Sequence, residues 1–127
     1  MNTSRLLLFA RDLLLTVLIE GAVLWAALDP MHDRRTKLLA AWWLSSCTLP
    51  IVQFVFPLLA QIGWPRWAWI TAAEIFAPAA ECALFALLVS AQSGDTRRAS
   101  PRDMGAIVLA NLSSFGFGEL LLAIGLR

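Results

Sequence analysis

The chain has 127 residues, of which 59% are hydrophobic and only 15% are charged, and its mean hydropathy is +0.70. Soluble domains carry about 25% charged residues, so this composition indicates an integral membrane protein. The net charge of +1 gives no electrostatic basis for binding nucleic acid, which needs a clustered basic surface.

Four apolar segments each have a length close to the about 20 residues that a helix needs to cross a bilayer. They predict membrane spans at about 6–28, 38–62, 67–91 and 104–126. The connections between them are too short to form a further domain. We therefore expect one all-α domain over residues 1–127, a bundle of four transmembrane helices in which neighbours run antiparallel.

The first segment carries polar residues near its start and near its middle. It follows Arg5 as a signal peptide would, but it is long for that role and contains Glu20, so we interpret it as a span. Arg11 and Asp12 are adjacent and are not expected to share a helical face, so we interpret them as anchors at the membrane surface. Glu20 lies deep in the segment, where an acidic residue is costly and needs a reason.

The second segment has a polar stripe with two prolines. Ser46, Pro50, Gln53 and Pro57 are spaced by four, three and four residues, which predicts that they share one helical face. Each proline lacks an N–H group and leaves the carbonyl four residues earlier without its helical partner. We expect Pro50 and Pro57 to shape this helix.

The third segment contains two glutamates on either side of a proline. Glu74 and Glu81 are seven residues apart, almost two helical turns, so both carboxyl groups are predicted on one face, about 10 Å apart along the axis. Pro78 lies between them and leaves the carbonyl of Glu74 unpaired. A kink, a free carbonyl and two acids are therefore expected together in an apolar setting.

The fourth segment combines polar and small residues. Asn111, Ser114 and Glu119 are its polar members. Ala110, Ser114 and Gly118 recur every four residues, and such a stripe lets another helix approach closely. We expect this packing to occur within the chain, and packing between chains is the alternative.

The polar residues are expected to form two layers inside the bundle when depth is counted from the centre of each segment. One layer contains Glu20, Ser46, Glu81 and Asn111, and the other, nearer the termini, contains Gln53, Glu74 and Glu119. The segments provide no lysine or histidine at these depths. The four glutamates must therefore be protonated, bind a cation, or meet a basic partner from outside the chain.

The loops provide an orientation, because lysine and arginine are more frequent in cytoplasmic loops. The first and third loops contain Arg34, Arg35, Lys37, Arg97, Arg98 and Arg102, whereas the opposite side has Arg5, Arg11, Arg66 and Arg127. This bias predicts that both termini lie on the non-cytoplasmic side.

Several kinds of chemistry find no support in the sequence. Cys47 and Cys82 lie in apolar segments without the spacing of a zinc site, so we interpret them as inert thiols, with a disulfide as the alternative. His32 is the only histidine. No nucleophile motif or phosphate-binding loop is present, so neither an enzyme nor a cofactor is expected, although the sequence leaves a metal ion open.

The intramembrane acids allow two main interpretations. The first is a binding site or pathway for protons or a small cation, formed by Glu20, Gln53, Glu74, Glu81, Asn111 and Glu119. The alternative is a non-catalytic structural or assembly subunit, whose acids pair with the helices of partner proteins. A carrier of a basic or metal cargo is a third. In each case we expect contact with the lipid bilayer and either a homo-oligomer or other membrane subunits.

Three short patterns resemble those of a group of small bacterial integral membrane proteins. They are Thr48-Leu49-Pro50, Glu74 with Glu81, and Asn111-x-x-Ser114-x-x-x-Gly118. Members of that group are similar to this chain over nearly its full length and have four spans. The resemblance implies a multi-pass protein of the bacterial inner membrane, and the group has no assigned activity.

Overall fold

A computed structural model of the chain describes residues 3–92 and 98–125. Over these residues the secondary structure is helical, with no strand, which confirms the all-α prediction. The helices are α1 (Thr3–Ala27), α2 (Arg34–Pro50), the π-helix η1 (Ile51–Val55), α3 (Leu58–Gln61), α4 (Arg66–Gln92) and α5 (Pro101–Ala123). Arg97, Arg127 and the predicted end of the last span at 126 lie outside the described residues.

Three helical stretches are long and apolar enough to cross a membrane. They are Arg34–Gln61, Arg66–Gln92 and Pro101–Ala123, with 28, 27 and 23 residues. Helix α1 has 25 residues, but every 18-residue stretch of it contains Arg11, Asp12 and Glu20, which make it more polar than the other three. The fold is therefore that of a helical membrane protein with three clear candidate spans.

The prolines of the second segment change the helix type between them. After Pro50 the backbone widens into η1, in which the N–H of Phe56 donates to the carbonyl of Ile51, five residues earlier, at 3.2 Å. A wider turn shifts the register of the residues that follow it relative to those before it. Of the predicted stripe, Gln53 and Pro57 line the cavity described below and Ser46 and Pro50 do not, and the buried hydroxyl of Ser46 has no hydrogen-bond partner among the described residues.

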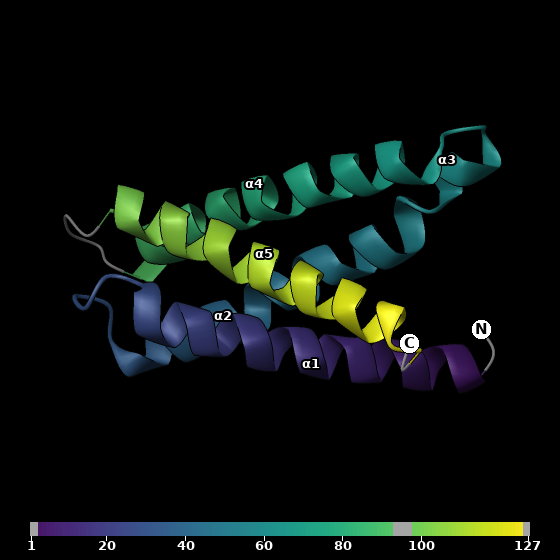
Figure 1. The fold of residues 1–127 in the computed structure, drawn as a ribbon. Coiled ribbons are helices and arrows are strands. Elements are labelled where there is room, and N and C mark those ends of the chain that lie inside the picture. Colours follow the sequence, from purple (N-terminus) through teal and green to yellow (C-terminus); the bar gives the residue numbers. More distant parts are fainter. Residues whose placement is uncertain (1–2, 93–97, 126–127) are drawn as a thin grey trace.

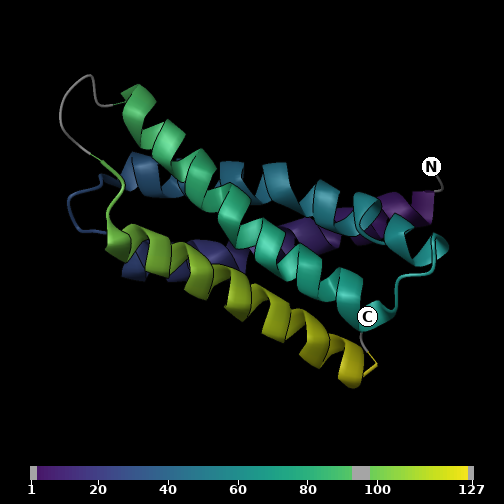
Figure 2. The same cartoon turned by 90° about the horizontal axis from the view of Figure 1, so that it is seen from above.

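The helices form a closed ring in which α1 packs against α2 and α5, and α4 packs against the same two helices. We call the end that holds residues 28–33 and 98–100 the loop end, and the end with the start of α1 and the end of α5 the termini end (Figure 1). In Figure 2 the start of α1 and the end of α5 lie apart, whereas the end of α1 lies beside the start of α5. The α1–α5 pair therefore diverges toward the termini end.

The apolar core occupies the half of the bundle near the loop end. Its fully buried large side chains are Leu24, Leu28, Leu44, Phe85 and Ile107. Small residues bring the helices together in this half, and a Cβ atom placed on Gly21 of α1 would lie only 3.3 Å from the Cβ of Ala41 in α2. The other half is not filled by side chains in this way and contains the site described below.

Candidate functional site

A cavity of about 450 Å³ lies between the helices in the half of the bundle near the termini end. Its lining comes from α1, from α2 and η1, from α4 and from α5. All the residues predicted to bind or conduct a cation line it, namely Glu20, Gln53, Glu74, Glu81, Asn111 and Glu119. The structure thus brings together around one space the side chains that the sequence placed in two layers, with the exception of Ser46.

The floor of the cavity, as we call Glu20, Glu81 and Asn111, is the buried part of the site, with exposed fractions of 3%, 1% and 6%. Glu20 Oε2 accepts a hydrogen bond from Ser45 at 2.6 Å, and its Oε1 accepts one from Ser114 at 2.7 Å. Glu81 is held in a similar way. Its Oε1 accepts from Thr48 Oγ1 at 2.6 Å, and its Oε2 accepts from Asn111 Nδ2 at 2.7 Å. Each carboxyl group is therefore fixed through both of its oxygens.

Hydrogen counting at the floor fits neutral carboxyl groups. Besides its glutamate, Thr48 Oγ1 lies 3.1 Å from the carbonyl of Leu44, but a hydroxyl group carries only one hydrogen. If Thr48 donates to Leu44, the hydrogen between Thr48 and Glu81 has to come from a protonated Glu81. Asn111 has two amide hydrogens, and they serve Glu81 Oε2 and the carbonyl of Ile107. One added proton on Glu81 therefore satisfies every group in this set.

The same count applies on the opposite side of the floor. Ser45 Oγ lies 3.0 Å from the carbonyl of Ala41 and 2.6 Å from Glu20 Oε2. Ser114 Oγ likewise lies 3.0 Å from the carbonyl of Asn111. A proton on Glu20 supplies the hydrogen of one of these two contacts while that serine donates to the backbone, and the other serine donates its single hydrogen to Glu20. The hydrogen bonds at the floor are thus compatible with two protonated acids, one on α1 and one on α4.

The mouth of the cavity, as we call Asp12, Arg66 and Glu119, lies at the termini end and reaches the surface. The side chains of Arg66 and Glu119 are 62% and 42% exposed, and Nη2 of the arginine lies 3.3 Å from Oε1 of the glutamate. Asp12 accepts from Gln53 Nε2 at 3.1 Å and from Arg11 Nη2 at 3.0 Å. Contrary to the expectation from their adjacency, Arg11 and Asp12 therefore form an ion pair, because the long arginine side chain folds back onto its neighbour.

Glu74 lies between the floor and the mouth and is only partly buried. In the part of the chain that the structure describes, its carboxyl group makes no hydrogen bond and no ion pair, in contrast to the other four acids of the cavity. A partner for this carboxyl group would have to enter the cavity.

The other predicted residues have varied positions. Pro57 lines the cavity, whereas Pro50 ends α2 and Pro78 lies within α4 away from the lining. Of the small stripe, Ala110 is buried in the core, Ser114 bonds to Glu20 of α1, and Gly118 lines the cavity. Ala110 and Ser114 of this stripe thus contact the rest of the chain, whereas Gly118 faces the cavity.

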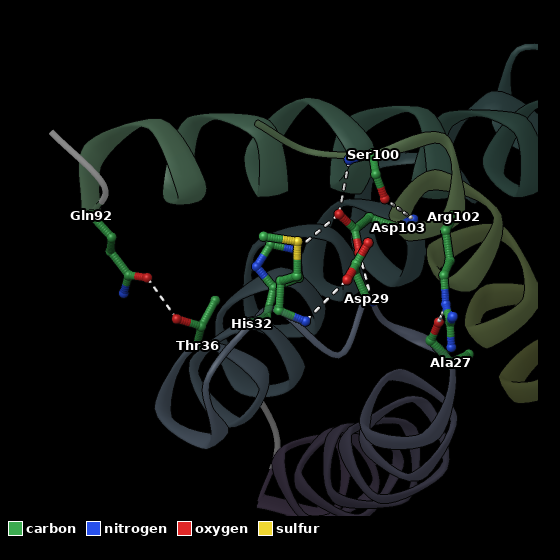
Figure 3. A network of polar contacts seen from close by, with 9 residues as sticks. Ala27, Asp29, His32, Thr36, Gln92, Ser100, Arg102 and Asp103 are labelled. Carbon is green, nitrogen blue, oxygen red and sulfur yellow. Dashed lines mark hydrogen bonds and ion pairs between the residues drawn. The ribbon is translucent and has the colours of Figure 1, made fainter. Parts of the chain in front are cut away.

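A buried polar cluster closes the loop end (Figure 3). Asp103 is fully buried and accepts hydrogen bonds from the backbone N–H groups of Asp29 and Ser100, both at 2.9 Å. His32 Nε2 lies 2.9 Å from Asp103 Oδ2, and its ring packs edge-on against Phe85. Three donors and a fully buried position make Asp103 the fixed point of this end.

Several of these residues do not stand out in the sequence. Ser100 and Asp103 form a capping box at the start of α5, and their spacing is a readable signal for such a box. The sequence places His32 only in a loop, because its contact with Asp103 spans 71 residues of sequence. Ser45 is hard to distinguish from Ser46, since only the helix register separates them. Cys47 and Cys82 are both free thiols, as expected.

Within residues 3–92 and 98–125, no group of three or more His, Cys, Asp or Glu side chains is arranged to hold a metal ion. Comparisons with known proteins found no matching family model, no matching curated protein and no matching solved structure. A function is therefore inferred from the cavity itself.

Proposed function

We propose that this protein is a multi-pass protein of the bacterial inner membrane in which a bundle of four antiparallel helices holds a binding site for protons or a small cation. The single observation that carries the proposal is the cavity of about 450 Å³ lined by five acidic side chains and one arginine. Acidic residues within membrane segments are rare and usually face a functional interior. Helix α1, with its more polar sequence, is the fourth span because its Glu20 faces this interior.

Access to the site from the termini end supports binding from one side of the membrane. The mouth is exposed, whereas the loop end is closed by Leu28, Phe85 and Asp103, all fully buried. By the bias of arginines and lysines, the termini end faces the non-cytoplasmic side, so a ligand would enter from there. A complete pathway across the membrane requires the loop end to open in a second conformation.

Charge movement in proteoliposomes tests the proposal. Solid-supported membrane electrophysiology records the current that follows a rapid change of pH or of Na⁺ or K⁺ concentration. We expect a current from the wild-type protein and a strongly reduced current from Glu74→Gln, which removes the ionisable group of the one cavity acid without a described hydrogen bond or ion pair and keeps its shape. Asp29→Asn is the matched control, because it removes one carboxylate at the loop end, where Asp29 Oδ1 accepts only from the N–H of Met31 at 3.0 Å among the described residues.

Two outcomes would contradict a cation site. Folded wild-type protein with no more current than empty liposomes would favour the alternative, a structural or assembly subunit whose acids pair with partner helices, and the partner would then be sought by co-purification. Equal currents from wild type and Glu74→Gln would show that this acid takes no part.

A further inference from the structure

The size and walls of the cavity indicate the kind of cation that it accommodates. Its volume of about 450 Å³ lies in the range of about 300–1,000 Å³ that is typical of sites for small organic molecules. Much of the wall is apolar, with aliphatic side chains from all four sides of the ring and the aromatic side chains Trp69, Phe115 and Phe117. Such walls bind an apolar body, which a bare inorganic ion does not have.

The charges of the cavity indicate where a positive group would lie. At the mouth, Glu119 is paired with Arg66, and Asp12 is paired with Arg11 and Gln53. At the floor, both glutamates are occupied by hydroxyl and amide donors. Among the described residues, Glu74 alone of these acids has a carboxyl group without a hydrogen bond or ion pair, and it faces the same space.

One aromatic side chain of the cavity lies on the same helix as Glu74. Trp69 and the aliphatic Ile70 precede Glu74 by five and four residues on α4, and all three line the cavity. Phe115 contributes to the lining from α5. A cationic nitrogen near a carboxylate and an aromatic ring gains from both the charge pair and the ring face. An ammonium group with an apolar substituent matches this combination of groups.

We propose that the cavity binds a small organic ammonium ion, whose positive head pairs with Glu74 and whose apolar body contacts Trp69 and the aliphatic wall. This inference rests on the proposed function, that the cavity binds a cation, and adds the chemical class of that cation. Hydroxyl and amide donors already occupy the acids of the floor, which leaves Glu74 as the counter-ion, so a singly charged ligand is favoured over a doubly charged one.

Equilibrium dialysis of the full-length protein in nanodiscs, with radiolabelled benzyltrimethylammonium as the probe, tests the inference. We expect saturable binding of the probe. Tetramethylammonium, which has the charged group but no aromatic ring, should displace the probe at least tenfold more weakly than unlabelled benzyltrimethylammonium does. Benzyl alcohol, which has the ring without the charge, should compete more weakly still. Glu74→Gln should weaken binding at least tenfold, Glu74→Asp should retain most of it, and Asp29→Asn should leave it unchanged.

Other results would overturn the inference in distinguishable ways. Displacement by Na⁺ or K⁺ at lower concentrations than by either ammonium ion would leave a cation site in place and exclude an organic ligand. Equal competition by benzyl alcohol would show an apolar cavity that does not recognise charge. Unchanged binding to Glu74→Gln, with Glu74→Asp equally unaffected, would place the head elsewhere. No binding of any cation, together with no current in proteoliposomes, would remove the proposed function as well.

Discussion

Replacing Glu81 by glutamine and by leucine tests whether the floor of the cavity holds a neutral acid. Glutamine reproduces the hydrogen bonds of a protonated glutamate, because its amide can donate to Thr48 while its carbonyl accepts from Asn111. We therefore expect Glu81→Gln to change the free energy of unfolding by less than about 1 kcal/mol. If Glu81 were instead ionised, both of its oxygens would accept hydrogen bonds. Replacing it by glutamine would then lose one of them, because the amide N–H group cannot accept a hydrogen bond.

Leucine provides the scale for this comparison. It removes the hydrogen bonds at 2.6 and 2.7 Å, although Thr48 and Asn111 keep their bonds to the backbone of α2 and α5. Hydrogen bonds between membrane helices contribute about 0.6 kcal/mol on average and at most about 1.7, so Glu81→Leu should cost about 1–3 kcal/mol. Unfolding by SDS in mixed micelles, followed by tryptophan fluorescence, measures both variants. A glutamine variant as unstable as the leucine variant would refute the neutral acid.

Three further substitutions test the packed half and the mouth. Asp103→Ala leaves the N–H groups of two residues and the ring of His32 without their acceptor, and each buried group left unsatisfied costs about 1–3 kcal/mol. The midpoint temperature of thermal unfolding should therefore fall strongly, and it should fall less for Asp103→Asn. Gly21→Leu forces α1 away from Ala41, because even a Cβ atom at position 21 would lie only 3.3 Å from the Cβ of that alanine. This variant should therefore unfold at a lower temperature in the same assay. Gly105→Leu is the control and should not, because a Cβ atom at position 105 meets no other atom within 4 Å. Arg66→Gln breaks an exposed ion pair and should change stability by less than about 1 kcal/mol; a larger loss would show that the pair closes the mouth.

The helical fold could be predicted from the sequence because length and hydropathy act locally. The helical segments Thr3–Ala27, Arg34–Gln61, Arg66–Gln92 and Pro101–Ala123 are each followed in the sequence by charged or turn-forming residues that end the apolar run. The grouping of Glu74 with Glu81 could be predicted for the same reason, because α4 is a continuous helix across both.

The details that could not be predicted depend on departures from regular helix or on distant contacts. Periodicity groups Ser46 with Gln53, but the π-helical turn after Pro50 shifts the register of Gln53 relative to α2, and within α2 it is Ser45 and Thr48 that bond to the acids. A proline in a sequence signals a disturbed helix without giving its direction. The contact between His32 and Asp103 depends on how two connections meet at one end, which no local pattern encodes.

The packed half and the hollow half of the bundle have a common explanation in side-chain size. Lipid tails are as apolar as leucine, so membrane helices associate through close packing and hydrogen bonds rather than through the hydrophobic effect. Small residues such as Ala40, Ala41 and Ala106 allow that packing near the loop end. Toward the termini end, η1 and the prolines interrupt the regular surface of the second helix, and α1 and α5 diverge. The acids lie where close packing stops, so the packed half holds the helices in place while the open half remains available to a ligand.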